Sequence, residues 1–308
     1  MSSKDPRKEY IQRLSSFNLR IEGNPEPIIL LCGGKEDPKL TPYLSLRDAI
    51  LKHCDGFNFE IPEHIRHWQS DSVFNDLIEF ETELAAICTM VTIIVESEGA
   101  IAELGAFSQF KELCQKMLII RSSEHKKDSF IHLGIIRFIE KENANNVRTY
   151  DWQIKKPAEI EKHTIEDALD DISSALEELG GTKNFNKTNE AHVTVLIYEL
   201  LSLFTALSLT EIIKYLKYFE IHVTQKQLKR KLFLLLEFEL IREEDYGGST
   251  YFTLSQGKSF FKMSYHNVGK KTFDRLRIRT SCNAYYANNN SEKNRVRVIK
   301  RVMGANKK

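Results

Sequence analysis

Small and polar residues follow a short β-branched run in the first half of the chain. Residues 91–95 (VTIIV) have the composition of a buried parallel strand, and a helical pattern that carries Glu103 begins shortly after them. The residues between strand and helix are Glu96, Ser97, Glu98, Gly99 and Ala100. Ligands of open α/β sheets bind beyond the carboxyl ends of the strands. The spacing therefore predicts a binding site at this strand end.

Glu103 is predicted to carry the chemistry of this site. It lies about one helical turn after Gly99, so its carboxylate can point back over the strand end. A carboxylate beneath an anomeric carbon stabilises, or traps covalently, the cationic sugar that forms when an N-glycosidic bond breaks. The alternative is an unpaired glutamate on a helix surface, but the small residues on both sides favour a site.

The string SEGAIAELGAF resembles the signature of the nucleoside 2-deoxyribosyltransferase family, in which a Gly-Thr pair precedes a nucleophilic Glu and a Gly. Gly99 and Ala100 stand at the Gly-Thr pair, and Glu103 stands at the nucleophile. The sequence departs from the family at two positions, since the Thr is Ala100 and the preceding Asp is Ser97. The resemblance implies an enzyme that cleaves N-glycosidic bonds, either by hydrolysis or by transfer to an acceptor base.

Nicotinamide adenine dinucleotide (NAD) is the favoured substrate. Its nicotinamide is already cationic, so it can leave without the proton that the missing Asp would supply. No cofactor is expected besides this substrate. Ser97 is predicted to bond a sugar hydroxyl, and Glu96 or Glu98 to orient a water or the nucleobase. Gly99 and Ala100 leave room for the substrate to approach the backbone.

Three further residues are candidates for substrate binding. Gly33 and Gly34 follow a buried-strand pattern at residues 27–32, and they either approach a phosphate or sugar or form only a tight turn. The resemblance favours the first reading, because a glycine-containing loop after the first strand lines the nucleoside pocket of that family. Arg66 could hold a phosphate.

Glu81, by contrast, is expected on the solvated face of a helix at residues 71–88.

Strand and helix patterns alternate about five times between residues 27 and 179, which predicts a doubly wound parallel sheet, flavodoxin-like in general form. A leading amphipathic helix at residues 5–18 is expected to pack on this sheet or on another subunit. Residues 1–182 are therefore predicted as a nucleoside deoxyribosyltransferase-like α/β domain. The polar residues 183–189 are predicted as a linker.

The second half of the chain does not continue the alternation of strand and helix patterns. Three helical patterns followed by a hairpin signal around Gly247 and Gly248 predict a winged helix-turn-helix domain at residues 190–265. The third helix presents Lys226, Lys229 and Arg230, which suit phosphates and base edges. Winged helices also bind proteins, so the pattern favours nucleic acid but leaves protein docking open.

Residues 266–308 are predicted as a basic nucleic-acid-binding tail. They show little apolar periodicity, and the asparagines at residues 283–290 suggest a mobile loop. Aromatic residues lie among the cations, which favours contact with nucleic acid over a merely solvated tail. The cations expected to bind are Arg275, Arg277, Arg279, Arg295, Arg297, Lys300 and Arg301.

Composition sets wider limits on the 308-residue chain. Its formal net charge of +1 hides an acidic first half and a basic end. No apolar run is long enough to span a bilayer, so a cytoplasmic protein without a membrane partner is expected. The five cysteines show no CxxC spacing, which favours reduced, mostly buried thiols over disulfides or a metal site.

The two-part plan also resembles the effector proteins of bacterial retrons. That resemblance implies a toxic glycosidase of an anti-phage defence system. Its partners would be the retron reverse transcriptase and multicopy single-stranded DNA with its RNA, which restrain the toxin until infection. A second reading remains open, in which the chain is a DNA-binding regulator whose α/β domain senses a nucleotide without catalysis. The oligomeric state, including a homo-oligomer, is also open.

Overall fold

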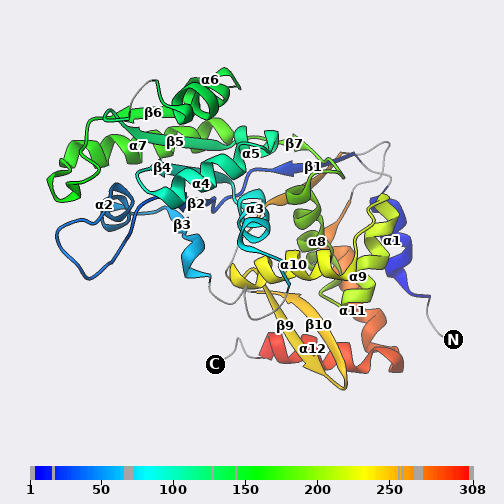
Figure 1. Cartoon of the computed structure of the whole chain (residues 1–308). Coiled ribbons are helices and arrows are strands. Elements are labelled where there is room, and N and C mark those ends of the chain that lie inside the picture. Colours follow the sequence, from blue (N-terminus) through cyan, green and yellow to red (C-terminus); the bar gives the residue numbers. More distant parts are fainter. Residues whose placement is uncertain are drawn as a thin grey trace. The chain divides into compact units, whose positions relative to one another are not determined.

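The chain forms two compact units. The computed structural model describes residues 4–15, 18–65, 73–125, 128–142, 144–255, 257, 260–266 and 273–304. One unit, here the α/β unit, comprises Glu26–Gly180. The other comprises Met1–Pro25 together with Gly181–Lys308 and is here called the split unit (Figure 1).

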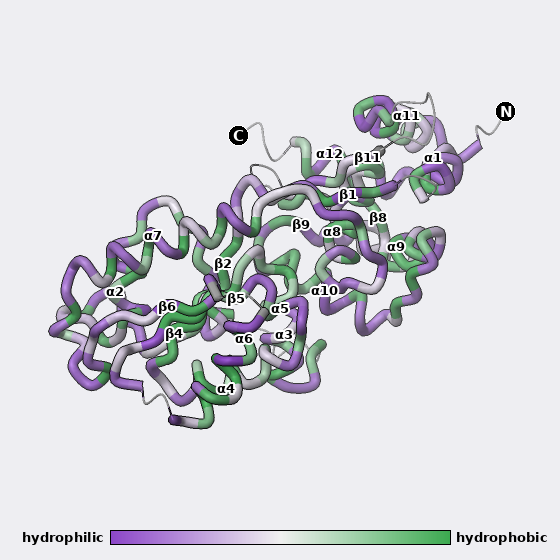
Figure 2. The backbone as a smooth tube through the Cα atoms, turned by 90° about the horizontal axis from the view of Figure 1, so that it is seen from above, coloured by the Kyte–Doolittle hydropathy of each residue, from purple (hydrophilic) through white to green (hydrophobic). Residues whose placement is uncertain are grey.

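The α/β unit contains a five-stranded parallel sheet with the order β3-β2-β4-β5-β6. The strands are β2 (Ile28–Cys32), β3 (Asn58–Glu60), β4 (Met90–Val95), β5 (Met117–Ser122) and β6 (Val147–Tyr150). Every residue of β2, β4 and β5 is buried, as expected for strands covered on both faces. In Figure 2 the hydrophobic stretches of this unit gather at these strands. The predicted doubly wound parallel sheet is confirmed.

Helices cover both faces of this sheet (Figure 1). On one face α2 (Leu46–His53) and α7 (Lys162–Leu179) pack against each other and share a core with β2, β4 and β5. On the other lie α3 (Leu77–Ile87), α4 (Glu98–Phe107) and α5 (Lys111–Cys114), and α3 contacts both α4 and α5. The remaining helical segments are 3-10 turns at Pro62–His64, Ala144–Asn146 and Pro157–Glu159, a π-helix at Ile131–Ile136, and α6 (Arg137–Glu142).

The strand order creates one point where the direction of winding reverses. From β2 the chain passes to β3 on one side, and it then returns to β4 on the other side of β2. In doubly wound sheets the crevice at such a switch point, beyond the carboxyl ends of the strands, is the usual ligand site. The residues that follow Cys32 and Val95 therefore face the position where a ligand is expected.

The split unit contains two small antiparallel sheets. The first has the order β11-β1-β7 and the second β8-β10-β9. The strands are β1 (Asn18–Glu22), β7 (Lys183–Asn184), β8 (Ala206–Leu207), β9 (Ile241–Tyr246), β10 (Ser249–Leu254) and β11 (Lys262–His266). The helical segments are α1 (Pro6–Leu14), α8 (Glu190–Phe204), α9 (Leu209–Leu216), a 3-10 turn at Lys217–Phe219, α10 (Gln225–Glu237), α11 (Arg275–Ala287), a 3-10 turn at Asn290–Glu292, and α12 (Lys293–Gly304).

The predicted hairpin is present between β9 and β10. Its turn residues Gly247 and Gly248 have φ values of 59° and 75°, in the left-handed region that two-residue hairpin turns require. The strands pair in register from Ser249 opposite Tyr246 to Leu254 opposite Ile241. The glycine pair thus supplies the backbone geometry that the sequence pattern predicted.

The first 25 residues group with the C-terminal part of the chain, whereas the sequence placed them in the α/β domain. β1 pairs with β11 on one side, where Ile21 lies opposite Met263, and with β7 on the other, where Ile21 lies opposite Lys183. Lys183 therefore belongs to a strand, although residues 183–189 were expected as a linker. Because β1 pairs with strands that are distant in sequence, no local sequence pattern could predict its partners.

The predicted basic tail is folded within the residues that the structure describes. α11 buries Ile278, Cys282 and Tyr286, which recur every four residues, and α12 buries Val298 and Val302. The expected mobile loop at residues 283–290 instead lies largely in α11. Polar and charged residues between these positions interrupt a narrow apolar stripe, so the helical periodicity was missed.

A buried ion network joins α1 to the C-terminal elements of the split unit. The guanidinium of Arg7 donates to Glu211 at 2.7 Å and to Glu292 at 2.9 Å. Arg295 donates to the same two carboxylates, at 2.6 Å and 2.7 Å. The ring of Tyr286 lies 5.2 Å from the Arg7 guanidinium and 5.0 Å from that of Arg295. These two cations and two anions thus alternate, and Asp5 also pairs with Arg7, at 2.9 Å.

Substituting Arg7 by Ala should destabilise the split unit. The change leaves the buried Glu292 and the half-buried Glu211 with one guanidinium between them, which should lower the free energy of unfolding by about 3 kcal/mol. Urea denaturation followed by circular dichroism measures the loss. Lys8→Ala, an exposed change on the same helix, serves as the control. Equal transition midpoints for the two variants would show that the network is not stabilising.

Candidate active site

The carboxylate of Glu96 holds together the loops at the carboxyl ends of β2 and β4. It accepts hydrogen bonds from the backbone N–H groups of Gly34 at 3.0 Å, Leu46 at 2.8 Å and Arg47 at 3.0 Å. Burial raises the pKa of Glu96, and these N–H donors act in the opposite direction. The structure therefore gives Glu96 a backbone-holding role in place of the expected one of orienting water or nucleobase.

Gly33 and Gly34 lie where the loop after β2 packs tightly. A Cβ on Gly33 would lie 2.9 Å from the Cβ of Arg47. A Cβ on Gly34 would lie 2.6 Å from the Cβ of Ser45 and 3.1 Å from Oε1 of Glu96. Close packing within the chain thus explains both glycines, although the predicted contact with a substrate remains a proposal.

Ser97 joins this loop to the start of α4. Its hydroxyl donates to the carbonyl of Gly33 at 2.8 Å and accepts from the backbone N–H of Ala100 at 3.1 Å, so Ser97 is the N-cap of α4. Glu98 and Gly99 are exposed beside it, whereas Ala100 is fully buried. Arg66 lies outside the described residues. The strand-end residues predicted from the sequence therefore meet at one edge, but Ser97 serves the helix.

Glu103 lies in a cluster of ionisable side chains from five separate segments. Burial raises the pKa of Glu103 to about 7, and the charge of Glu63 acts in the same direction. A hydrogen bond from the Cys32 thiol and the charge of Arg47 act in the opposite direction. Burial, followed by the charges of Glu103 and Glu63, raises the pKa of Glu81 to about 8. Two carboxyl groups with pKa values near neutrality thus lie within electrostatic range of each other.

Arg47 supplies the positive charge of this cluster from α2. Its side chain is 4% exposed and forms two hydrogen bonds to Glu63, at 3.0 Å and 3.1 Å. Its Nε is buried and has no hydrogen-bond partner among the described residues. A buried donor without a partner is unusual in a folded protein. The arginine therefore retains one donor that it does not use in binding Glu63.

The sequence did not single out Arg47, Glu81 or Cys32. The expectation that Glu81 lies on a solvated helix face was wrong, because it is half-buried and faces the charge of Glu103. Glu81 lies three and four residues before the fully buried Leu84 and Ala85, and this helical spacing was the available signal. Cys32 is completely buried at the end of β2.

Such an arrangement can perform acid–base and nucleophilic chemistry. Two carboxyl groups that repel each other titrate as a pair, so one holds a proton over the pH range in which the other is ionised. The ionised member can attack or stabilise an electron-poor carbon, and the protonated member can donate to a leaving group. Among the described residues, no group of His, Cys, Asp and Glu could hold a metal ion.

The cations predicted to bind nucleic acid fall into two groups. The exposed group comprises Lys226, Lys229, Arg277, Arg279, Arg297, Lys300 and Arg301. Within it, Arg279 donates to the carbonyl of Ser202 at 2.9 Å, Arg297 to the hydroxyl of Tyr246 at 2.8 Å, and Arg301 pairs with Glu244 at 3.4 Å. These three side chains are therefore exposed but partly engaged by their own unit.

The second group is occupied within the protein. Arg295 belongs to the buried network with Glu211, and Arg275 pairs with the buried Glu199 at 3.2 Å. Arg230 is also buried, because α10 is covered along most of residues 230–235. The structure thus corrects the expectation that Arg230 and Arg295 offer exposed charge to nucleic acid.

The sequence profile of the STM3845 retron effector protein family matches residues 43–243, which include α2, α4, the strands from β3 to β8 and the first half of β9. The chain belongs to this retron effector family. The match covers Arg47, Glu63, Glu81 and Glu103. None of the described helices is long and apolar enough to cross a membrane.

Two curated proteins of Escherichia coli resemble this family member. The "Retron Ec73 putative ribosyltransferase/DNA-binding protein" is 24% identical over 201 residues, which are 58% of this chain and 64% of that protein. The protein of retron Ec86 with the corresponding description is 26% identical over 144 residues, 46% of this chain and 47% of its own length. The chain therefore spans less than two thirds of either relative.

The surroundings of Gly34 and Gly99 predict different effects of a substitution by alanine on stability. Gly34→Ala should lower the free energy of unfolding by about 2 kcal/mol, because the new Cβ would collide with Ser45 and Glu96. Gly99→Ala should be neutral or slightly stabilising, since the nearest atom to its Cβ would be 3.9 Å away in a helix that favours alanine. Thermal denaturation of both variants tests the difference. Equal losses would contradict the packing described for the loop after β2.

The raised pKa of Glu103 predicts a pH-dependent effect on stability. An unfolded glutamate has a pKa of about 4.3, so between that pH and about 7 the folded protein binds a proton that the unfolded chain lacks. Its free energy of unfolding therefore falls as pH rises. Glu103→Gln should stabilise the protein by on the order of 1–3 kcal/mol at pH 8 and by little at pH 5. Urea denaturation at both pH values, with exposed Glu112→Gln as control, should reveal this contrast. Equal stabilisation by Glu103→Gln at pH 5 and pH 8 would contradict a raised pKa of Glu103.

Proposed function

We propose that this retron effector is an N-glycosidase, with Glu103 as its nucleophile and a nucleotide as its substrate. The observation that carries the proposal is the position of Glu103 in a cluster of carboxyl groups, in which Glu103 and Glu81 are half-buried and Glu63 is exposed. The cluster also includes Cys32, the last residue of β2, beside the switch point of the sheet. The word ribosyltransferase in the names of both relatives agrees with chemistry at an anomeric carbon.

In the proposed reaction the carboxylate of Glu103 attacks the anomeric carbon and the bond from that carbon to the base breaks. The electron pair of that bond leaves with the base, and a glycosyl ester on Glu103 remains. Water then attacks the same carbon, the ester bond breaks, and the proton of that water passes to an ionised carboxylate of the cluster. The Glu103 carboxylate that this cleavage releases suits this last role, because burial raises the pKa of Glu103 to about 7.

NAD remains the favoured substrate. The hydroxyl of Ser97 already donates to Gly33, so the position of the family's Asp offers no proton to a neutral leaving base. Nicotinamide needs none, because it leaves a cationic glycoside as a neutral molecule. The protonated state of Glu81 near pH 7 also reduces the negative charge that a pyrophosphate would meet. Arg47 and the predicted Arg66 are the candidates for holding that pyrophosphate.

Glu103→Gln should reduce release of nicotinamide from NAD by at least about a thousandfold, because an amide cannot form the glycosyl ester. Liquid chromatography after incubation with NAD and with a panel of deoxynucleosides measures both substrates. Glu112→Gln, an exposed change outside the cluster, should retain the wild-type rate. Equal nicotinamide release by wild type and Glu103→Gln would remove Glu103 from the mechanism. Intact phage defence in Glu103→Gln would favour the regulator that senses a nucleotide without catalysis.

We further propose that the split unit contains a winged helix that binds nucleic acid. The order α8-β8-α9-α10-β9-β10 and the three-stranded sheet β8-β10-β9 agree with that assignment. α10 would be the recognition helix; it begins with a capping box between Thr224 and Gln227 and exposes Lys226 and Lys229. Multicopy single-stranded DNA with its RNA is the proposed ligand, and the retron reverse transcriptase is the proposed protein partner.

Removing the two exposed lysines of α10 should weaken this binding in a salt-dependent way. The double variant Lys226→Ala with Lys229→Ala should make the slope of log affinity against log salt concentration less steep. The expected change is the contribution of about one to two phosphate contacts. Fluorescence anisotropy with a labelled DNA strand between low and physiological salt measures the slope. The matched control is Lys214→Ala with Lys217→Ala, two exposed lysines of the segment before α10. An unchanged slope in the α10 variant would favour protein docking by this helix.

A further inference from the structure

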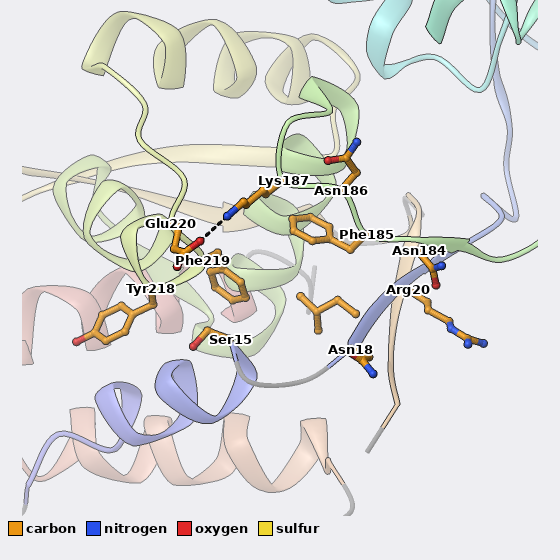
Figure 3. A pocket seen from close by; sticks show the side chains of 11 residues that line it. Ser15, Asn18, Arg20, Asn184, Phe185, Asn186, Lys187, Tyr218, Phe219 and Glu220 are labelled. Atoms are coloured by element: carbon orange, nitrogen blue, oxygen red, sulfur yellow. Dashed lines mark hydrogen bonds and ion pairs between the residues drawn. The ribbon is translucent and has the colours of Figure 1, made fainter. Parts of the chain in front are cut away.

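A cavity of about 840 Å³ lies in the split unit, beside β1 and the segment that follows β7 (Figure 3). Alternation along β1 places Arg20 on the face opposite to Leu19. Figure 3 shows the side chains of Arg20 and Asn184 on the other side of this strand from the ring of Phe219. The polar and aromatic groups of this cavity therefore do not converge on one ligand. A convergent set of polar groups lies instead in the α/β unit, at the carboxyl end of β5.

Arg121 is a buried cation in this set. It is the penultimate residue of β5 and is 6% exposed. Its Nε donates to the hydroxyl of Thr149 at 2.9 Å, and its Nη1 donates to Nδ1 of His132 at 2.8 Å. Neither acceptor is a carboxylate, and the guanidinium forms no ion pair with any residue that the structure describes. Buried arginines are normally paired with an anion, because removing an unpaired charge from water is costly. The fold thus leaves the charge of Arg121 uncompensated.

The contact with Arg121 also determines which nitrogen of His132 carries a proton. A guanidinium can only donate, so Nδ1 of His132 accepts and the proton of the neutral ring lies on Nε2. Within the described ranges, neither this N–H nor Nη2 of Arg121 has an acceptor. His132 belongs to the π-helix Ile131–Ile136, a rare conformation that is frequent at functional sites. Two side chains that bond to each other therefore each retain an unused donor.

This pair lies on the same face of the sheet as Glu103. Ile120 and Leu31 belong to the core that the strands share with α2 and α7. Alternation therefore turns the next residues, Arg121 and Cys32, to the opposite face. On that face the thiol of Cys32 donates to Glu103. Because β4 lies between β2 and β5, Arg121 and Cys32 are separated by two strand spacings, about 10 Å across the sheet.

The surroundings of the pair are fixed on one side and open on the other. The imidazole of His125 donates from Nε2 to the carbonyl of Val95 at 2.6 Å, which holds the loop after β5 against the end of β4. The π-helix packs beside α4, since a Cβ on Gly105 would lie 4.0 Å from Cδ1 of Ile135. By contrast, Thr149 is exposed, so the guanidinium that donates to it borders on solvent at β6. An anion can approach the pair from that side.

We propose that Arg121 and His132 bind one phosphate group of the nucleotide substrate. The phosphate would accept hydrogen bonds from Nη2 and Nε2 and would neutralise the buried guanidinium. This contact would add to the one proposed for Arg47. The identity of the ligand as substrate rests on the proposed function, whereas the phosphate site itself requires no turnover. Inorganic phosphate offers the same chemistry, and the probes below separate the two sources.

The stability of the ligand-free protein is the first test. Arg121→Met keeps much of the side-chain volume and removes the uncompensated charge, so it should leave the melting temperature unchanged or raise it. Differential scanning fluorimetry in a buffer without phosphate measures this temperature. The control is Arg137→Met, which removes an exposed arginine from α6 of the same unit. A melting temperature of Arg121→Met well below that of the control would show that Arg121 serves the fold and would overturn the proposal.

Binding is the second test, by calorimetry on the full-length chain. The probes are inorganic phosphate, adenosine, and adenosine diphosphate ribose, the product that hydrolysis of NAD would release. Arg121→Met should weaken binding of adenosine diphosphate ribose at least about tenfold and leave binding of adenosine unchanged. His132→Asn keeps an acceptor for Arg121 near the position of Nδ1 but lacks the Nε2 donor, so it should weaken the same probe about fivefold. Arg137→Met should bind all three probes as the wild type does.

The outcomes separate this site from the proposed glycosidase. If the wild type releases nicotinamide from NAD, Arg121→Met should raise KM at least about tenfold with a smaller change in kcat. If it releases none, the glycosidase proposal fails, and calorimetry still decides the phosphate site. Binding of inorganic phosphate that is lost in Arg121→Met would support free phosphate as a ligand of the same site. Equal binding of adenosine diphosphate ribose by the wild type, Arg121→Met and His132→Asn would overturn the proposal, as would its failure to bind the wild type.

Discussion

The carboxylate of Glu96 is the constraint on which the candidate active site depends. It ties the end of β4 to the first N–H groups of α2, where the partial positive charge of a helix terminus favours an anion. That tie draws the loop after β2 so close that Gly34 admits no side chain. It also fixes the start of the helix from which Arg47 reaches Glu63. A residue that would not touch the substrate therefore determines the electrostatic surroundings of Glu103.

The sequence identified the position of the candidate site in the fold better than it identified the residues that form the site. The strand end near Glu103 could be predicted, because a buried parallel strand followed by a helix is a local pattern and its carboxyl end must lie at a sheet edge. The roles of Ser97 and Gly33 could not, because a hydroxyl at a strand end suits a helix cap and a ligand equally well. Arg47 and Glu81 come from helices distant in sequence, and only the fold brings their charges together.

Similar physics explains which parts of the fold could be predicted. The parallel sheet follows from short continuous apolar runs, and the β9–β10 turn follows from two glycines that accept positive φ. The partners of β1 carry no such signal, because antiparallel pairing opposite β11 depends on residues at the other end of the chain. In α11 the buried Ile278, Cys282 and Tyr286 are separated mainly by polar residues and follow two arginines, and this composition resembles that of an unfolded basic segment.

The pairing of β1 with β7 makes the α/β unit an insertion within the split unit. The chain completes Glu26–Gly180 before it reaches Glu211 and Glu292, two carboxylates that pair with Arg7. At roughly 5–20 residues per second, synthesis of the remaining chain occupies several seconds, during which the α/β unit can already fold. The order of translation thus allows the unit that carries Glu103 to mature first, while the unit proposed to bind nucleic acid waits for its last helices. Any restraint on Glu103 that requires the completed split unit must therefore begin after translation is nearly finished.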